Sequence, residues 1–329
     1  MNILNLSLGQ DTGGQQWRLA KAWRQLLPND TYTSVTTSKT FYPIENRLDW
    51  LRLRNEWWPP ADVVHLNNDL RFVERQQMRK LTVKQPKPYV IHHHGTMYRT
   101  RPDYHLEALR EYKAHAICST VDLWAIAPES TTWLPQCYDR EELMEYRRSE
   151  YRSKDGVLRI AHAPTNRPIK GTDALANAVY KLKRLGQRIE LDIIEGVKNE
   201  ECLRRKARAD VFVDQLLLGY GCNAIEAFGM GDLPVIAGVD VENCKVKIRQ
   251  AVPPDTKERM LEKWDRYPFM EATEATLTTA LLKMMDPKVR RYWANRGLRH
   301  FNKHHAHTVV VPMLRKVYES AIANGRYSH

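Results

Sequence analysis

A glycine-bearing loop and one carboxylate are the residues of this chain whose types and spacing best suit chemistry. The pattern predicts a buried strand at 211–213, a loop with Gly219 and Gly221, a short helix that carries Glu226, and a second buried strand at 234–237. A glycine loop that runs into a helix leaves backbone N–H groups directed at an anion, and the helix dipole favours negative charge there. Glu226 lies about one turn into the helix, so its carboxylate would stand beside a bound phosphate and suit ribose hydroxyls. A purely structural strand, loop and helix is the alternative.

The same stretch resembles the nucleotide-binding half of the GT-B glycosyltransferases, specifically the retaining enzymes of family four. The resemblance rests on the loop glycines, on the Glu-Ala pair at 226–227 and on Pro-Val-Ile-Ala at 234–237. In that family these motifs form the donor-sugar site, which implies that Glu226 binds the donor ribose. The implied donor-binding residues nearby are Gly219, Tyr220, Gly221, Cys222 and Asn223. One departure is Leu218, eight residues before Glu226, where the family usually has a second glutamate. Donor identity and activity therefore stay open.

Two cations precede a predicted helix at 173–185. Arg167 and Lys170 lie on the loop after a predicted strand at 157–163, and two positive charges at a helix entry can neutralise a diphosphate. Family-four enzymes are similar here, with an Arg and a Lys-Gly that hold the donor phosphates. The resemblance thus implies catalytic roles for Arg167 and Lys170, with Asn166 in the donor site beside them. The spacing between the two cations is shorter than in the commonest family pattern, and a solvated basic loop is the other interpretation.

A further glycine loop follows the first predicted strand, at 3–8. Gly13 and Gly14 precede a helix pattern at 16–27, so strand, loop and helix form the opening βα unit of a doubly wound sheet. The loop is not Gly-x-Gly-x-x-Gly, and the pattern does not favour a dinucleotide site. The resemblance implies that the backbone at Gly13 and Gly14 approaches the donor diphosphate or the acceptor. A plain tight turn would explain the same residues.

Three consecutive histidines, His92, His93 and His94, end a predicted strand at 88–91, at the edge where parallel sheets hold ligands. Because neighbouring residues on a strand point to opposite faces, at most two of them could share an ion. No third ligand is signalled, so we predict no metal site. The resemblance implies a catalytic role for His94 beside the donor sugar, where a hydrogen-bonding group is useful. A histidine satisfied within the core is the competing hypothesis.

The length of 329 residues predicts two domains. We expect an α/β protein of GT-B type, with two Rossmann-like doubly wound domains that face a central cleft. The expected boundaries are 1–150 for an acceptor-side domain, 151–308 for a nucleotide-sugar-binding domain, and 309–329 for a helix that crosses back to the first domain. We also expect two short strands, separated by a polar turn, within 114–139 and a long helix from residue 273.

Lysine and arginine outnumber aspartate and glutamate by 51 to 39, a net charge of +12. This charge favours anionic donors, membrane surfaces and nucleic acid without choosing among them. Residues 40–60 hold Trp50, Trp57 and Trp58 among arginines, which fits an amphipathic helix for an acceptor or a membrane, or simply core aromatics. Five cysteines without CxxC spacing argue against zinc and disulfides. No apolar run reaches about 18 residues, so we expect a cytoplasmic protein, with peripheral contact at the inner membrane face left open.

The resemblance implies a glycosyltransferase that moves a sugar from a nucleoside diphosphate sugar, UDP- or GDP-linked, with retention and without a metal ion or other cofactor. The sequence contains no Asp-x-Asp, the metal-holding motif of the other main glycosyltransferase fold. The expected acceptor is anionic, and a glycan or lipid-linked saccharide comes first. Two alternatives stay open: a modified base in phage-like DNA, and a protein that binds nucleotide sugars without catalysis. The oligomeric state is not predicted.

Overall fold

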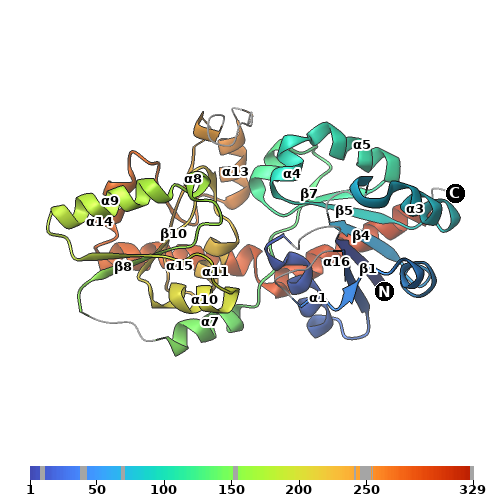
Figure 1. Cartoon of the computed structure of the whole chain (residues 1–329), viewed down its shortest axis with the longest axis horizontal. Coiled ribbons are helices and arrows are strands. Elements are labelled where there is room, and N and C mark those ends of the chain that lie inside the picture. The colour runs from blue at the N-terminus through green and yellow to red at the C-terminus, as the bar shows by residue number, and fades with distance from the viewer. Residues whose placement is uncertain are drawn as a thin grey trace. The chain divides into compact units, whose positions relative to one another are not determined.

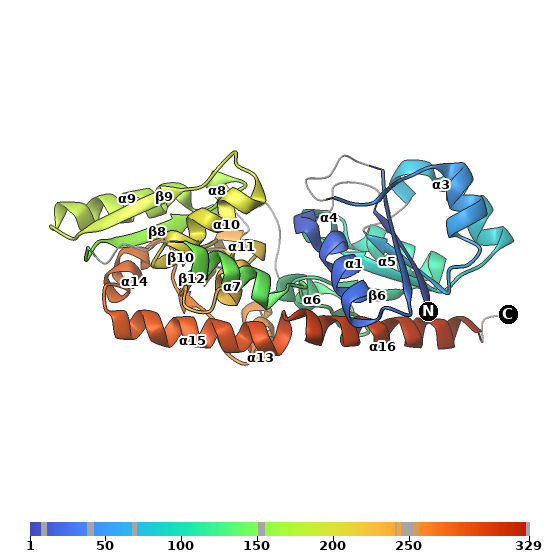
Figure 2. The same ribbon diagram turned by 90° about the horizontal axis from the view of Figure 1, so that it is seen from below.

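The computed structural model of the chain describes residues 1–7, 12–37, 43–67, 71–150, 155–240, 242–244, 253 and 255–326. The chain divides into two compact units (Figure 1). The first consists of Met1–Cys137 and His307–His329, and the second of Tyr138–Ala306. Each unit has its own mainly parallel sheet with helices on both faces (Figures 1 and 2). The expected α/β class with two Rossmann-like doubly wound units is therefore confirmed.

The first unit contains a seven-stranded sheet in the order β3-β2-β1-β4-β5-β6-β7, and all of its pairs are parallel. Its strands are β1 (Asn2–Ser7), β2 (Thr31–Thr36), β3 (Asn46–Arg47), β4 (Val63–Asn67), β5 (Tyr89–His93), β6 (His115–Cys118) and β7 (Thr132–Trp133). Its helices are η1 (Thr12–Gly14), α1 (Gln15–Leu26), α2 (Trp50–Arg52), η2 (Leu53–Trp57), α3 (Arg71–Lys84), α4 (Gly95–Thr100), α5 (Pro102–Tyr112), α6 (Val121–Ile126) and α16 (His307–Arg326).

Alternate strand residues of the first unit enter two separate cores. Ile3 packs with residues of α1 and α16, whereas the next residue, Leu4, packs with residues of α3 and α5. Likewise, Val63 packs in the core with Ile3, and Val64 packs in the core with Leu4. Because side chains alternate along a strand, a sheet covered on both faces needs apolar residues at consecutive positions. The carboxy-terminal helix α16 contributes to one of these cores and contacts α1, β4 and β5.

Two segments of the first unit bear on the sequence expectations. The segment 114–139 contains two short strands, β6 and β7, and residues 121–126 between them form the helix α6, most of which is buried. Periodicity cannot separate a short strand from a short buried helix. In the tryptophan segment, residues 38–42 lie outside the described residues. Trp58 is fully buried, and Trp50 and Trp57 pack against the same core, so these side chains are core aromatics and not an exposed face.

The second unit contains a six-stranded sheet in the order β11-β12-β10-β8-β9, with β13 also paired to β12. Its pairs are parallel except β11 with β12. The strands are β8 (Leu158–His162), β9 (Ile189–Ile193), β10 (Val211–Val213), β11 (Leu218–Gly219), β12 (Val235–Val239) and β13 (Met270–Glu271). The helices with described bounds are α7 (Arg140–Ser149), α8 (Arg167–Lys170), α9 (Thr172–Arg184), α10 (Asn199–Arg208), α11 (Cys222–Gly229), α13 (Thr256–Trp264), α14 (Leu277–Lys283) and α15 (Pro287–His304).

Helix α7 belongs to the second unit, although the sequence analysis placed it in the first domain, so the division lies at Cys137 rather than at residue 150. Arg147 of α7 explains this placement. Its buried guanidinium ion-pairs with Asp232 and donates to the carbonyl oxygens of Ala207, at 2.6 Å, and Ala209, at 2.7 Å. The long helix expected from residue 273 is two helices, because Asp286 caps a new helix through a 2.7 Å bond from the Lys288 N–H.

Each sheet reverses its strand order once. In the first unit, β1 lies between β2 and β4, and in the second unit β8 lies between β9 and β10. In doubly wound sheets, ligands bind outside the carboxyl ends of the strands at such a reversal. The loops that follow β1, β4, β8 and β10 are therefore the first places to look for a site.

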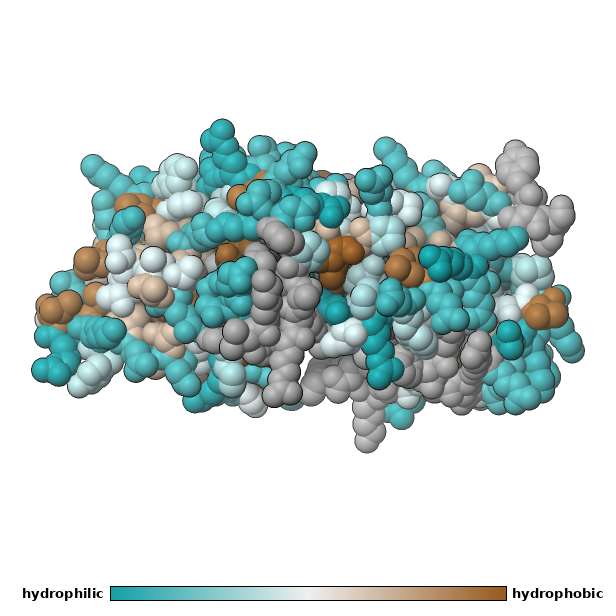
Figure 3. All heavy atoms as spheres, turned by 90° about the horizontal axis from the view of Figure 1, so that it is seen from above, coloured by the Kyte–Doolittle hydropathy of each residue, from teal (hydrophilic) through white to brown (hydrophobic). Residues whose placement is uncertain are grey.

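The surface is mainly hydrophilic in the view of Figure 3, with hydrophobic side chains as separate patches. Exposed large hydrophobic residues are scattered over both units: Leu51, Val83, Tyr180, Leu185, Val197, Leu282 and Tyr292. In the part of the chain that the structure describes, no helix is both long enough and apolar enough to cross a membrane.

Candidate functional site

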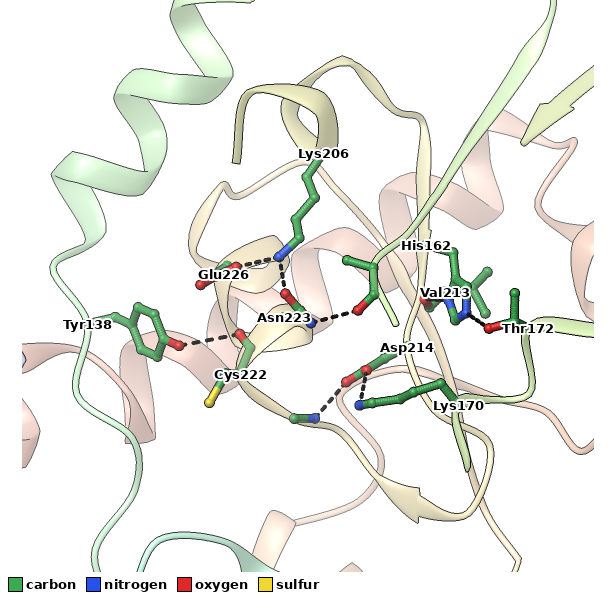
Figure 4. A network of polar contacts seen from close by, with 12 residues as sticks. Tyr138, His162, Lys170, Thr172, Lys206, Val213, Asp214, Cys222, Asn223 and Glu226 are labelled. Carbon is green, nitrogen blue, oxygen red and sulfur yellow. Dashed lines mark hydrogen bonds and ion pairs between the residues drawn. The ribbon is translucent and has the colours of Figure 1, made fainter. Parts of the chain in front are cut away.

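One buried carboxylate joins the two loops at the strand reversal of the second unit. Asp214 follows β10 directly and accepts two hydrogen bonds (Figure 4). The Lys170 Nζ donates to its Oδ1 at 2.9 Å, and the Gly221 N–H donates to its Oδ2 at 2.6 Å. Lys170 ends α8 on the loop after β8, and Gly221 is the residue before α11. Three residues from separate loops thus meet at the carboxyl edge of the sheet.

The Lys170–Asp214 pair is buried on one side only. The Asp214 side chain is 1% exposed and that of Lys170 is 14% exposed. Burial alone would raise the pKa of Asp214, but the Lys170 charge and the Gly221 N–H outweigh it, and the pKa is lowered. An ammonium group has three donors, and Asp214 uses one of them. Lys170 is therefore held in place by the protein and still able to meet an anion.

The start of helix α11 lies beside this cation. Gly221 precedes the helix, and a Cβ placed on it would lie 3.6 Å from the Lys170 Nζ. The first N–H groups of a helix have no acceptor within the helix, and the helix dipole makes that end positive. The α11 start at Cys222 and Asn223 and the Lys170 ammonium together suit a phosphate group.

Arg167 makes a different contact from the one we expected. The Arg167 Nε donates to the Glu195 Oε1 at 2.9 Å, and the Arg167 side chain is 54% exposed. The hydrogen bond to Glu195 raises the pKa of the guanidinium. Asn166 caps α8 by accepting from the Ile169 N–H at 3.2 Å. Arg167 and Asn166 lie on the loop that carries Lys170, but in this structure Arg167 pairs with a carboxylate and Asn166 serves as a helix cap.

Glu226 is part of a buried triad that the sequence did not reveal. Its side chain is 4% exposed and forms an ion pair with Lys206, whose side chain is 0% exposed. The Lys206 Nζ also donates to the Asn223 Oδ1 at 2.5 Å, and the Asn223 amide donates to the Ala163 carbonyl at 3.0 Å (Figure 4). Burial works against the charge of Lys206, but Glu226 outweighs it and the pKa is raised.

The triad leaves one oxygen of Glu226 with a weaker contact. The exposed residue Asn199, the first of α10, donates to the Glu226 Oε1 at 3.4 Å, whereas Oε2 accepts from Lys206. Ribose hydroxyls would therefore have to reach Oε1 from the side of Asn199. The role of Glu226 in ribose binding stays a prediction.

Gly219 and Tyr220 lie just before α11 and contact buried side chains of the second unit. Gly219 has a φ of 76°, and a Cβ on it would lie 2.3 Å from the Trp264 ring, so only glycine fits. The Tyr220 hydroxyl lies 2.7 Å from the His300 Nε2 and 2.8 Å from the His305 Nε2. The Tyr220 side chain is thus anchored in the core, and the role of Tyr220 in donor binding stays a prediction. Cys222 is not part of a disulfide and has intermediate exposure.

The remaining predicted residues, Gly13, Gly14 and His94, belong to the first unit. Gly13 and Gly14 have φ values of 61° and 74°, the left-handed conformation that glycine adopts without strain. Residues 8–11 of the same loop lie outside the described residues. The His94 Nε2 lies 3.0 Å from the Asn67 Oδ1 and its Nδ1 lies 3.2 Å from the Ser119 Oγ. His94 is therefore held within the unit, and its role toward a donor sugar stays a prediction.

A chain of buried polar groups extends from His94. Asn67 donates to the Asn5 Oδ1, and the Asn5 amide donates to the Tyr32 hydroxyl at 2.6 Å. On the other side, the His92 Nδ1 lies 3.2 Å from the His65 Nε2, and the ring centroids of His92 and His94 are 4.0 Å apart. Burial lowers the pKa of His94 to about 4. These side chains form an uncharged network at the carboxyl ends of β1, β4 and β5.

The histidine network also reaches the carboxy-terminal helix of the first unit. The Tyr318 hydroxyl of α16 lies 2.6 Å from the His65 Nδ1 and 3.4 Å from the Tyr32 hydroxyl. Burial lowers the pKa of His65 to about 3. Within the described part of the chain, no three His, Cys, Asp or Glu side chains are grouped so that they could hold a metal ion.

Asp214 and Lys206 are the functional candidates that sequence reasoning missed. Asp214 had a signal, because it is a carboxylate directly after a buried strand, at the edge where ligands bind. Lys206 had none. It stands among charged residues of α10, where a lysine is normally solvated, and only the packing of α10 against α11 brings it to Glu226.

Comparison with known proteins gives structural but not sequence matches. No protein-family model and no curated protein sequence matches the chain. An alpha-glucosyltransferase in complex with UDP-glucose and DNA containing an abasic site has a TM-score of 0.65 at 9% identity, covering 97% of this chain and 99% of that one. A glycosyltransferase from Rickettsia africae has a TM-score of 0.66 at 10% identity, covering 98% and 99%. MurG from Acinetobacter baumannii has 0.50 at 11%, covering 96% and 99%.

Identities this low show the fold alone. These glycosyltransferases have the GT-B fold, and the chain has it over nearly its whole length. The fold expected from the sequence resemblance is thereby confirmed.

Proposed function

We propose that the chain is a glycosyltransferase that uses a nucleoside diphosphate sugar, and that the diphosphate binds at the carboxyl edge of the second sheet. The observation that carries this proposal is the meeting of Lys170, Asp214 and Gly221 at the strand reversal. The GT-B fold of enzymes such as the alpha-glucosyltransferase crystallised with UDP-glucose supports the choice of ligand.

The proposed chemistry follows from where charge develops. When the bond between the sugar and the diphosphate breaks, the diphosphate gains negative charge and the sugar gains positive charge. Lys170 and the N–H groups at the start of α11 would stabilise the leaving group without rearrangement, because Asp214 already fixes the cation. Transfer would then need no divalent ion, and we propose that it retains the configuration of the donor.

The nucleoside would lie toward α10. Glu226 is held by Lys206 and covered by the exposed residue Asn199, so its Oε1 is the oxygen that a ribose hydroxyl would reach. The negative charges of Glu200 and Glu201, in the first turn of α10, would repel a phosphate bound at the start of that helix. These charges support a donor with its phosphates at α11 and its ribose beside Glu226.

DNA is the acceptor that the comparisons favour. Alpha-glucosyltransferases of this fold have been solved with UDP and a 13-mer DNA containing a HMU base, and the chain carries a net charge of +12. A positively charged surface attracts polyanions whatever their sequence. A glycan or lipid-linked saccharide is the second candidate, and it rests on the family resemblance of the donor-site motifs alone.

Thermal unfolding with and without nucleotides tests the donor site, because a ligand that binds only the folded state raises the melting temperature. UDP, GDP and their sugars would be compared on the unmodified chain, Lys170→Ala and Lys181→Ala. Lys181 is an exposed residue of α9 in the same unit and serves as the matched control. We expect a shift that Lys170→Ala abolishes and Lys181→Ala keeps. Absence of any shift would refute the donor site.

Release of the nucleoside diphosphate tests transfer itself. With the donor identified, the rate of release would be compared without acceptor, with DNA containing 5-hydroxymethylated pyrimidines, and with saccharides. Stimulation by one acceptor supports an enzyme and names the acceptor class. Binding of donor with no release under any of these conditions would instead indicate a protein that binds nucleotide sugars without catalysis.

A further inference from the structure

A second concave surface of the second unit lies between β13, α14 and the first turns of α15. This groove has a volume of about 960 Å³, and we call it the β13–α15 groove. Its charged and aromatic lining consists of Lys257, Lys283 and Lys288, Tyr267, Tyr292 and Trp293, and Glu271. None of these residues takes part in the Lys170–Asp214 site.

The groove has excess positive charge. Its carboxylate Glu271 is already matched, because it accepts from the Lys257 Nζ at 2.7 Å and from the Tyr267 hydroxyl at 3.0 Å. Lys283 of α14 and Lys288 of α15 have no ion-pair partner among the residues that the structure describes. The nearby Asp286 carboxylate accepts the Lys288 backbone N–H and not an ammonium group of the described residues, so two exposed and unpaired lysines favour an anionic ligand.

Aromatic rings also line the groove. Tyr292 is 54% exposed, which is unusual for so large an apolar ring. Trp293 meets it at a centroid distance of 5.2 Å and an angle of 86°, and the Arg296 guanidinium lies 5.8 Å from the Trp293 ring centroid. Trp293 is thus fixed by its neighbours, and Tyr292 presents an open face.

The spacing of charge and ring suits a nucleotide. Lys288 and Tyr292 are four residues apart on one helix, so they lie on one face about 6 Å apart along the axis. A phosphate and its base in an extended strand are separated by a similar length. Proteins that bind single strands combine such cations with aromatic platforms on which the bases stack.

We propose that the β13–α15 groove binds a single-stranded segment of nucleic acid, with phosphates on Lys283 and Lys288 and a base stacked on Tyr292. Single-stranded rather than duplex nucleic acid fits, because the rings can stack only on unpaired bases. The proposal draws on the proposed function only for its DNA acceptor, and the groove binds nucleic acid whether or not a sugar is transferred.

Two matched double variants test the groove. Lys288→Ala/Tyr292→Ala removes one exposed lysine and one exposed tyrosine of α15. Tyr180→Ala/Lys183→Ala removes the same pair of residue types from α9, also exposed and in the same unit but outside the groove. The probe is a fluorescein-labelled (dT)15 oligonucleotide, and its anisotropy is measured at several salt concentrations.

We expect the groove variant to bind (dT)15 roughly tenfold more weakly, with a salt slope shallower by about 0.7. The control should keep the affinity and the salt slope of the unmodified chain, because neither of its residues lines the groove. Equal losses in the two variants, no binding by the unmodified chain, or equal binding of a duplex of the same length would each overturn the proposal. Tighter binding of polygalacturonate, lost in the groove variant, would replace nucleic acid by an acidic glycan.

The test separates the groove from the donor site. Lys288→Ala/Tyr292→Ala should keep the melting shift caused by the nucleotide, whereas Lys170→Ala should lose that shift and keep its affinity for (dT)15. Loss of both the nucleotide-induced melting shift and the affinity for (dT)15 in the groove variant would show that the variant damages the unit as a whole. Binding of (dT)15 to the single variant Tyr292→Ser would then test the stacking role. Unchanged (dT)15 affinity in that variant would refute the stacking role.

Discussion

The two sheets reverse their strand order in the same way, but the side chains at the two reversals differ in chemistry. The second unit places charges there, because Lys170 and Asp214 form an ion pair whose cation is partly exposed. The first unit places neutral polar groups there, namely the buried amides of Asn5 and Asn67 and the buried ring of His94. One architecture, used twice, therefore offers an anion site in one unit and an uncharged hydrogen-bonding network in the other.

Desolvation explains what each region can do. A buried charge is tolerated only when it is paired, and a buried histidine becomes neutral instead. In the second unit, Lys170 pairs with Asp214 and remains partly exposed, so it can attract a diphosphate. In the first unit, burial lowers the pKa of His94 to about 4, so this network can bind hydroxyl groups but does not attract anions. The difference assigns the phosphates of the proposed donor to the second unit.

Lys206→Ala should produce the largest effect, because it leaves the carboxylate of Glu226 unpaired in the interior. Removing one partner of a buried ion pair costs about 3–5 kcal/mol. We expect the free energy of unfolding of the second unit to fall by this amount. Urea unfolding followed by circular dichroism and by tryptophan fluorescence would measure it, with both probes needed because the two units can unfold separately.

The control for Lys206 removes both charges at once. Lys206→Met with Glu226→Gln should recover most of the lost stability, since neither side chain then carries an unpaired charge. A loss below about 1 kcal/mol in Lys206→Ala, the size expected for a neutral hydrogen bond, would break the contrast between the buried ion pairs of the second unit and the uncharged histidine network of the first.

Gly221→Ala should give the next largest effect, on ligand affinity rather than on stability. Its φ of −113° suits any residue, and the added Cβ would be in ordinary contact with Asp214 at 3.5 Å and Lys170 at 3.6 Å. The fold should therefore be kept, while the methyl group occupies space where a phosphate would approach Lys170. We expect the affinity for UDP or GDP, whichever binds, to fall at least about tenfold, or 1.4 kcal/mol, by isothermal titration calorimetry.

Gly219→Ala is the matched control for that substitution. It lies in the same loop, but its φ is 76° and the new Cβ would meet the Trp264 ring at 2.3 Å, so it should lower the melting temperature. If Gly221→Ala destabilised the chain as much as Gly219→Ala, or left nucleotide affinity intact, the anion site beside Lys170 would be wrong.

Local patterns predict the elements and much of the donor edge, because strands, glycine turns and helix starts are encoded by neighbouring residues. The strand β10, the loop with Gly221 and the helix with Glu226 follow from such patterns. Lys170 was found for the same reason. Its partner Asp214 is 44 residues away, and their pairing is set by the order of β8 and β10 in the sheet.

Contacts between distant segments explain what the sequence could not predict. Lys206 reads as a solvated residue, and its burial depends on how α10 packs on α11. The hydroxyl of Tyr220 is held in the core by His300 and His305, which are 80 and 85 residues later in the sequence. Burial by segments that are distant in the sequence lowers the pKa of all three consecutive histidines, which their own sequence pattern does not reveal.

His65→Gln should have a smaller effect, which depends on pH. Burial lowers the pKa of His65 from its usual 6.5 to about 3, so the unfolded chain takes up a proton that the folded chain does not. Stability should therefore fall as the pH drops from 6.5 toward 3, and it should not change through this group above 6.5. Glutamine cannot titrate, so the variant should lose about 1 kcal/mol at pH 8 and show a flatter acid dependence than the unmodified chain.

Melting temperatures between pH 8 and pH 4 measure this difference in slope. Tyr318→Phe, which removes the hydroxyl that lies 2.6 Å from the His65 Nδ1 but no titrating ring in that range, is the control and should keep the acid dependence. Identical slopes in His65→Gln and the unmodified chain would mean that His65 takes up its proton in the folded state. The histidine network of the first unit would then not be uncharged, and the contrast with the second unit would fail.

Arg167→Ala should have the smallest effect, because an exposed ion pair such as Arg167 with Glu195 contributes little to stability. The melting temperature should not change. If Arg167 leaves Glu195 to join the diphosphate, nucleotide affinity should fall by roughly twofold to fivefold, far less than in Lys170→Ala, and Glu195→Gln should raise affinity by freeing the guanidinium. No change in either variant would assign the diphosphate to Lys170 alone. A loss as large as that in Lys170→Ala would mean that the exposed loop, and not the half-buried pair with Asp214, makes the second unit an anion site.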